Sequence, residues 1–538
     1  MGQFLFWLEA AVTSVLFAAL GLAIVSRIQR RGRRWVVRIV WSMLAILPWL
    51  VAIGAFAAVG IWAGGALVPL MLSAIGGIAT LLATIAVVTR GRKISPGTNK
   101  TIAETWRLSR LALAWVGALL LTCMTFWNLD LAVRQEMAAI RVEAGAVALS
   151  VAPPRVPDSQ NAAVLYRQAW EALAARNDGP EKWDRAVAEW LHPREGKFRP
   201  ADERMRAFLE RSQAAIELLR KAAERPACNF GTQYNPPSVA VVLPSLSKMR
   251  DLSRLLCLSS RAAASKGRMD DAMDDLHAAW VLAEHCTAEP ALIASLVAFA
   301  AEAQAFDTCQ YVLDHGTLNH ESLDASVGAV PVSYQDALHR SMRMETAFGM
   351  CMFTMADPAM AFPAEHAPGV ADAVIGAAAP YRAFLWNADV AAYLRWMHRY
   401  EQLSSEPYFK SVSEWQSPRQ KAGREGVGGL LASIIAPSFS RSAELAAIAD
   451  AQRRLVTVSI AMWRYRLAEG SFPSELGQLV PHYVFKVPTD PFTGESMNMA
   501  RTDDGIVIYS VGPDMNDDGG KPLDRRTLKG DVSLRLRG

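Results

Sequence analysis

The sequence predicts three parts: a four-span membrane α-helical bundle, a mostly α-helical exterior domain built of helical hairpins, and a small α+β domain at the C-terminus. Three observations support this division. A long uncharged run lies near the N-terminus, the middle repeats apolar residues at helical spacing, and two short alternating strands stand near the C-terminus. The predicted boundaries are 1–135 for the membrane region, 136–157 for a linker, 158–440 for the helical domain and 441–538 for the C-terminal domain.

Composition and charge agree with a membrane region joined to an acidic remainder. The chain has 538 residues, of which 51% are hydrophobic and 20% are charged, whereas soluble domains carry about 25% charged residues. Residues 1–130 contain 12 lysines and arginines and three acids, a net charge of +9, and the remainder has a net charge of −5. The basic residues are therefore concentrated in the first quarter, and we expect no nucleic-acid partner.

Uncharged stretches predict the four membrane spans. The run Ile39 to Thr89 has no charged residue and would measure about 77 Å as one helix, whereas a bilayer core is about 30 Å thick. It is therefore expected to form two spans, with a turn at Trp62–Gly65. Ala10–Ser26 and Leu111–Leu129 supply the other two spans.

Basic residues predict how these spans are oriented. Six lysines or arginines lie between residues 27 and 38, and six more lie between residues 90 and 110. Positively charged loops stay in the cytoplasm, so the N-terminus and the large C-terminal part are expected on the periplasmic side of a bacterial inner membrane. Glu9, which directly precedes the first span, is the only candidate for an ionisable residue in the membrane, so the bundle is interpreted as an anchor rather than a transporter.

The clearest unit of the helical middle runs from Leu246 to Cys286. Two helices flank Gly267, Ala272 follows five residues later, and Pro290 stands beyond the second helix. This pattern resembles a tetratricopeptide hairpin. The resemblance implies a scaffold with a protein-binding groove, and the alternative is an ordinary helical domain without one. An aromatic concentration over 381–403 is expected to lie in the core.

Recognisable catalytic motifs are missing from the sequence. The histidines have no zinc-protease spacing, and neither a nucleophile elbow nor a phosphate-binding glycine loop is present. His285 and Cys286 are adjacent, and side chains of adjacent helical residues point about 100° apart, so they are interpreted as a structural pair. The cysteines are widely spaced, and one disulfide between them is compatible with an oxidising exterior.

The C-terminal region has the most specific pattern. A long helix over 444–468 is followed by four ordered motifs and by strands at 505–510 and 531–536. The motifs are a helix exit at Tyr465–Pro473, Leu479–Tyr483, Asp490–Gly494 and a glycine-rich loop at Tyr509–Gly520. Their order resembles the globular domain of the major pseudopilin of type II secretion systems, which implies a pilin-like fold for about 90 residues.

The last loop of that family binds calcium, and the residues here have suitable chemistry. Asp514, Asn516 and Asp518 place oxygen ligands at alternate positions, as in the first half of an EF-hand loop. The twelfth position is an arginine, so Asp524 or Asp531 must complete the site, and the family pattern favours Asp531. The alternative is a polar turn held by aspartate side chains.

The predicted 444–468 helix contains six charged residues, so it cannot enter a bilayer and the chain is not itself a fibre subunit. The sequence therefore predicts a membrane-anchored extracytoplasmic scaffold that contacts other proteins, near a type II secretion or pilus-like system. The alternative is an exported, membrane-anchored hydrolase with a dispersed active site within 158–440. A pocket with paired carboxylates or a histidine–acid pair of shifted pKa would favour the hydrolase, and an apolar groove would favour the scaffold.

Overall fold

The computed structural model describes residues 132, 135–176, 180–191, 198, 202–234, 243–316, 318–320, 323, 333–354, 386–415 and 437–537. The chain divides into two compact units. The larger unit comprises Val142–Cys351, Tyr393–Gly426 and Leu430–Gly538, and it contains the features on which the functional argument depends.

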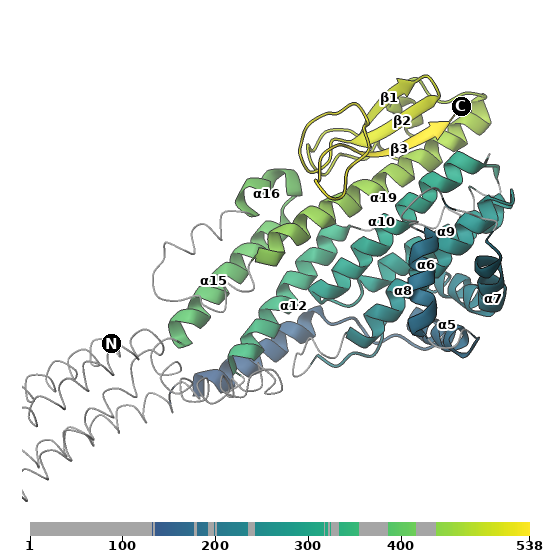
Figure 1. Ribbon diagram of the computed structural model, residues 1–538. Helices are drawn as coiled ribbons and strands as arrows, with labels where there is room; N and C mark the ends of the chain where they lie inside the picture. Colours follow the sequence, from purple (N-terminus) through teal and green to yellow (C-terminus); the bar gives the residue numbers. More distant parts are fainter. Residues whose placement is uncertain are drawn as a thin grey trace, which may run out of the picture. The chain divides into compact units, whose positions relative to one another are not determined.

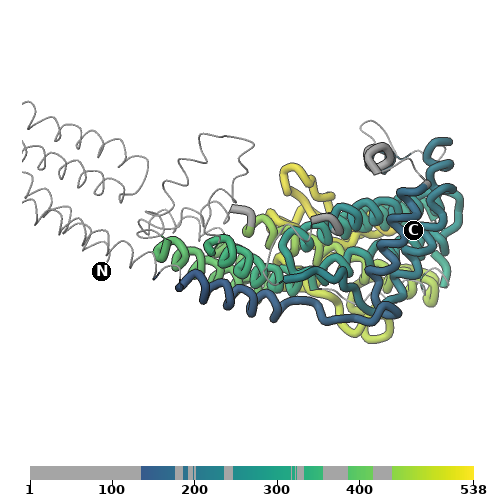
Figure 2. Tube along the Cα trace, turned by 90° about the horizontal axis from the view of Figure 1, so that it is seen from below, coloured from purple at the N-terminus to yellow at the C-terminus, as the bar shows by residue number. Residues whose placement is uncertain are grey.

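Helices make up most of the described chain (Figure 1). They are α5 (Ala162–Arg176), α6 (Pro180–Leu191), α7 (Glu203–Ala223), α8 (Leu243–Ala264), α9 (Met269–Cys286), α10 (Leu292–His315), α12 (Tyr334–Thr354), α15 (Trp386–Ser405), α16 (Tyr408–Trp415) and α19 (Pro437–Glu469). Helices α8, α9 and α10 pack against one another, and α19 lies along α10. Figure 2 gives the same arrangement from a second direction, with the C-terminal segment against these helices.

The hairpin of α8 and α9 turns at the glycine singled out in the sequence. Gly267 has a φ of +71°, a left-handed conformation that side chains disfavour. Ala272 is fully buried, and its carbonyl accepts a hydrogen bond of 2.7 Å from Ser260 Oγ. The small side chain at 272 therefore lets the second helix approach the first closely.

The fold-class prediction of four membrane spans is corrected by this structure, which is mostly helical with one small sheet. Within the described ranges, α10 is the one helix long and apolar enough to cross a membrane, and 67% of its apolar window is buried inside the protein. Its apolar residues are covered by α8, α9 and α19, so they form a core instead of facing lipid. The four predicted spans themselves fall on residues outside the described ones.

Aromatic residues of α15 lie in the core, as their spacing indicated. Trp386, Tyr393 and Tyr400 are buried and recur every seventh residue, which is two helical turns. Tyr400 packs against Trp415 of α16 and Phe439 of α19, with ring centroids 5.6 Å and 5.1 Å apart.

A three-stranded antiparallel sheet follows α19, in the order β1 (Asn498–Thr502), β2 (Gly505–Ser510), β3 (Val532–Arg537). Ile508 of β2 pairs with Met499 of β1 and Leu534 of β3. The alternating burial of β3 places Val532, Leu534 and Leu536 inward. Strands β2 and β3 contact α19, and β3 also contacts α10, so the sheet shares its core with the helical domain.

Two details of the C-terminal region differ from the sequence analysis. Helix α19 begins at Pro437, seven residues before the expected start. Strand β1 was not predicted, because its sequence Asn-Met-Ala-Arg-Thr lacks an alternating pattern. Its pairing with β2 through the tight turn at Asp503 and Asp504 selects the extended conformation.

Candidate functional site

The acidic loop between β2 and β3 contains the five predicted calcium ligands. Asp514 lies at its start, where its Oδ1 accepts a hydrogen bond from the backbone N–H of Asn516 (3.2 Å) and its Oδ2 accepts one from Gly530 (3.0 Å). Asp514 therefore ties the beginning of the loop to its end. The side chains of Asn516 and Asp518 are exposed.

Asp531 is buried where the loop enters β3. Its two oxygens accept backbone hydrogen bonds from Asp518 (3.3 Å) and Gly520 (2.6 Å). Burial raises the pKa of Asp531, and the nearby Asp517 and Asp518 raise it further, whereas the backbone donors lower it. The loop thus concentrates negative charge, with Asp517 as a member that the sequence analysis missed.

Asp524, the remaining predicted ligand, forms its hydrogen bonds within a turn of its own. It accepts hydrogen bonds of 2.8 Å from the backbone of Arg526 and from Thr527 Oγ1. The backbone hydrogen bond is the main cause of its lowered pKa. Its carboxylate therefore stabilises that turn.

The loop contains oxygen donors of the kind that calcium takes, but they are not gathered into a cluster. Across the described residues, no three histidine, cysteine, aspartate or glutamate side chains converge closely enough to hold a metal ion. The carboxylate oxygens of Asp514 and Asp531 already accept backbone hydrogen bonds. Calcium binding therefore stays a prediction, and Asp524 does not fit the proposed set.

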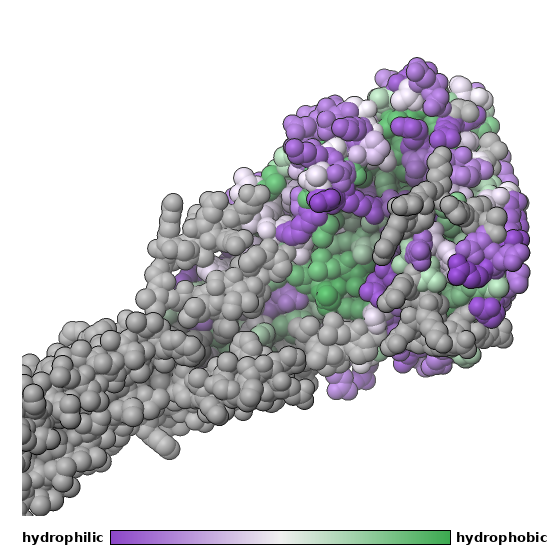
Figure 3. Space-filling model, viewed as in Figure 1, coloured by the Kyte–Doolittle hydropathy of each residue, from purple (hydrophilic) through white to green (hydrophobic). Residues whose placement is uncertain are grey.

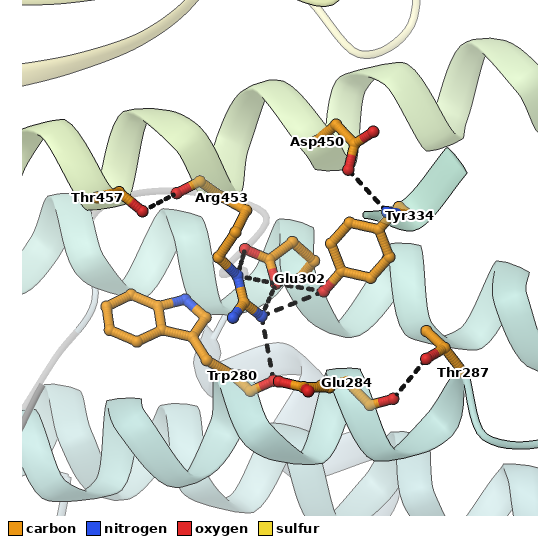
Figure 4. Close-up of polar contacts among 8 residues, drawn as sticks. All are labelled: Trp280, Glu284, Thr287, Glu302, Tyr334, Asp450, Arg453 and Thr457. Carbon is orange, nitrogen blue, oxygen red and sulfur yellow. Dashed lines mark hydrogen bonds and ion pairs between the residues drawn. The ribbon is translucent and has the colours of Figure 1, made fainter. Parts of the chain in front are cut away.

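A second polar cluster joins α19 to α10 and α12 inside the protein (Figure 4). Arg453 Nη2 lies 2.6 Å from Glu302 Oε2, and both side chains are almost fully buried. The hydroxyl of Tyr334 donates a hydrogen bond of 2.6 Å to the same glutamate oxygen, and Arg453 Nη2 also donates to the carbonyl of Trp280 (3.1 Å). The Arg453–Glu302 ion pair and its hydrogen bonds thus connect α19, α10, α12 and α9.

The electrostatics of this cluster follow from its burial. Burial alone would lower the pKa of Arg453, but the charge of Glu302 outweighs it and the pKa is raised. Burial and Glu302 raise the pKa of Tyr334 well above its ordinary value of 10. Arg453 is therefore a cation and Tyr334 a neutral hydrogen-bond donor at any physiological pH.

Two carboxylates, one buried and one partly buried, cap helices that belong to other segments. Asp450 of α19 accepts a hydrogen bond of 2.7 Å from the first backbone N–H of α12, that of Tyr334. Glu345 of α12 accepts one of 3.1 Å from Leu292, the first residue of α10. Since the first N–H groups of a helix lack partners within it, each carboxylate fixes the start of a neighbouring helix.

The sheet docks on one face of α10 through a row of polar residues. Asp307, Gln310 and Asp314 are spaced so that they share a helix face. Arg525 pairs with Asp307 at 2.7 Å and Arg537 with Asp314 at 3.2 Å. Between them, the amide of Gln310 donates to the carbonyl of Arg535 (3.1 Å) and accepts from its N–H (2.8 Å). Gln310 thus pairs with β3 as a neighbouring strand would.

His285 and Cys286, the adjacent pair noted in the sequence, are both buried, and both are neutral at physiological pH. His285 Nδ1 lies 2.8 Å from the hydroxyl of Tyr166, and burial lowers the pKa of His285 to about 4. Burial raises the pKa of Cys286 to about 12. Nucleophilic cysteines need the thiolate, and this environment suppresses it.

Comparison with known proteins gives no match for this chain: no family model, no curated protein and no solved structure is similar to it.

Proposed function

We propose that this chain is a membrane-anchored, extracytoplasmic scaffold of a bacterial inner membrane, in which a helical domain holds a pilin-like C-terminal module for contact with other proteins. The pilin-like resemblance points to subunits of a type II secretion or pilus-like apparatus as partners. The observation that best supports the scaffold role is the way in which the module is held on the helical domain. Helix α19 is fixed to α10 and α12 by the Arg453–Glu302 ion pair and the Asp450 cap, so the module has one defined orientation.

Surface chemistry is in keeping with protein contacts. Figure 3 has hydrophilic residues over the loops of the C-terminal module and hydrophobic residues gathered on the helices beside it. Phe485, in the segment that follows the Leu479–Tyr483 motif, is 91% exposed. Exposed aromatic side chains are frequent anchors of protein interfaces, so Phe485 is the residue that we expect to enter a partner.

Capture of partners from detergent-solubilised membranes tests the proposal. The tagged full chain is expected to retain pilin-like subunits, and Phe485→Ser is expected to lose most of them without a change in melting temperature. Val142→Ser is the matched control, because Val142 is also an exposed apolar residue, at 76%, but lies outside the module. Retention by the Phe485 variant equal to that of the unchanged chain would contradict the role of this surface.

The hydrolase alternative has one observation in its favour. Burial raises the pKa of Glu345 to about 7, as a general acid would need. Its oxygen, however, caps α10, which gives it a structural role. Turnover of ester, peptide or glycoside substrates that is lost in Glu345→Gln, together with no reproducible protein partner, would favour the hydrolase over the scaffold.

We also propose calcium as the cation for the loop between β2 and β3. Besides burial, the nearby charges of Asp517 and Asp518 raise the pKa of Asp531, and a bound cation would relieve that repulsion. The expected ligands are Asp514, Asn516, Asp518 and Asp531.

A further inference from the structure

Two buried nitrogen atoms where α9 meets α19 have no hydrogen-bond partner among the described residues. They are Nε1 of Trp280 and Nη1 of Arg453. Trp280 is fully buried and Arg453 is 2% exposed. The indole nitrogen carries one hydrogen and the guanidinium nitrogen carries two. Buried donors without an acceptor are rare in folded proteins, because each has given up its hydrogen bond to bulk water. An acceptor is therefore expected beside these two nitrogens.

The two nitrogens belong to residues that are in direct contact. Arg453 Nη2 donates a hydrogen bond of 3.1 Å to the backbone carbonyl of Trp280. Figure 4 shows the indole nitrogen of Trp280 turned toward the guanidinium group of Arg453. Glu302 accepts from Nε at 3.1 Å and from Nη2 at 2.6 Å, so the direction of Nη1 in the planar guanidinium is fixed. One small acceptor can therefore receive hydrogen bonds from both nitrogens.

A third buried atom, Nδ1 of His277, also lacks a hydrogen-bond partner among the described residues. His277 lies three residues before Trp280 on α9. Residues three apart share a helix face, and helical side chains lean toward the N-terminus, so the side chain of Trp280 leans over the turn that carries His277. Burial and then the charge of Arg453 lower the pKa of His277, so its ring is neutral at pH 7. In the tautomer protonated at Nε2, Nδ1 is a hydrogen-bond acceptor.

We propose that one water molecule is bound between α9 and α19, where it accepts hydrogen bonds from Trp280 Nε1 and Arg453 Nη1 and donates one to His277 Nδ1. Buried waters form about three hydrogen bonds to polar groups of the protein, and two donors with one acceptor match a water. A small anion cannot donate to His277, and the charges of Glu302 and Glu284 already accompany Arg453. The water adds a link between α9 and α19 beside the ion pair. The assignment does not depend on the scaffold role.

Transfer of magnetisation from water to the indole protons of the isotope-labelled full chain is the direct test. The Nε1 proton of Trp280 is expected to give a rotating-frame cross-peak at the water frequency, with the sign that distinguishes a bound water from hydrogen exchange. Trp280→Phe assigns this resonance. Trp386 is the matched control without a water, because it is 2% exposed and its Nε1 donates to the carbonyl of Phe353 (2.9 Å). No cross-peak at Trp280, or one equal to that of Trp386, overturns the proposal.

Two further measurements test the acceptor and the identity of the occupant. His277→Leu is expected to reduce the Trp280 cross-peak by roughly half or more, because the water loses one of about three hydrogen bonds. His277→Gln, whose side-chain oxygen can accept, is expected to retain it. Loss of the cross-peak in neither variant, with the Trp386 resonance unchanged, contradicts the site.

Sodium bromide is the probe for an anion, and it replaces sodium sulfate at constant ionic strength. The Trp280 indole resonance is expected to stay unchanged. A saturable shift of this resonance, with none at Trp386, would show that an anion occupies the site and that the water assignment is wrong.

Discussion

Among the described residues, Arg453 and Glu302 form a fully buried ion pair in which each would be an isolated charge without the other. Arg453→Met or Glu302→Gln is expected to lower the free energy of unfolding by about 3–5 kcal/mol, since the remaining partner loses its compensation. The double variant Arg453→Met/Glu302→Leu is expected to recover much of this loss. Urea denaturation followed by circular dichroism measures these changes.

The control for that series lies on the same helix. Arg441 pairs with Glu444 near the surface of α19, and exposed pairs contribute about 1 kcal/mol or less. Arg441→Met is therefore expected to change stability little. A loss in Arg453→Met no larger than in Arg441→Met would show that the buried pair is unimportant for folding.

Asp450 makes stability depend on pH with a sign that follows from its burial. Burial raises its pKa from 3.8 to about 6, so the folded protein binds a proton that the unfolded chain has released. This difference in proton binding stabilises the folded protein by about 3 kcal/mol at most. The stabilisation is fully present below pH 3.8 and is lost as pH rises through 6. His285 acts oppositely, because its lowered pKa of about 4 costs stability as pH falls below 6.5.

Comparing the unchanged chain with an Asp450 variant separates the pH dependence of stability caused by Asp450 from that caused by His285. Asp450→Asn keeps an oxygen that accepts from Tyr334 and removes the titration. Its stability relative to the unchanged chain is expected to improve between pH 4 and pH 7.5, measured by urea denaturation at each pH. Glu406→Gln, an exposed site on the same unit, is the control. A pH-independent difference for Asp450→Asn would contradict the titration.

At the scale of elements, the sequence predicted the turns and strands that are determined by residues close together in the chain. The turn at Gly267 and the strand 505–510 depend on nearby residues, and the structure places them where expected. Strand β1 and the first turns of α19 depend on partners distant in the sequence, so their own residues gave little signal. The Gln310 contact with β3 joins residues 225 positions apart, and no spacing rule could predict it.

The same contrast explains the candidate sites. The acidic loop was found because its ligands stand close together in the sequence. The Arg453–Glu302–Tyr334 cluster was missed as a unit because its members come from three helices. The charges on α19 were noted only as a barrier to membrane entry, although the burial of a charged residue in a long helix usually indicates a partner.

Calcium is expected to stabilise the loop between β2 and β3, since a cation relieves the repulsion around Asp531. Millimolar calcium should raise the melting temperature of the full chain by a few degrees, and magnesium should do so less. Asp514→Asn should reduce the shift, whereas Asp524→Asn should leave it unchanged because Asp524 faces its own turn. No shift in the unchanged chain, or an equal loss in both variants, would refute the loop as a calcium site.

At the scale of the whole molecule, the C-terminal module is a part of the helical domain and not an attachment to it. Helix α19 is buried on nearly all sides, because the sheet covers one face while α10 and α16 cover others. Helices that are hydrophobic or buried all round need neighbours on every side. The resemblance to pilin-like domains therefore describes local form, while stability is shared across the larger unit.

Residues 437–538 expressed alone are accordingly expected to fold poorly. The fragment would expose Phe439, which packs on Tyr400 in the full chain, and would leave Arg453 without Glu302. Circular dichroism should give less helix than the 33 residues of α19 require, and heating should give no cooperative transition, in contrast to the full chain. Replacing Arg453 by methionine in the fragment should not weaken it further, because its charge has no partner there. A fragment that unfolds as cooperatively as the full chain would establish the module as an independent domain.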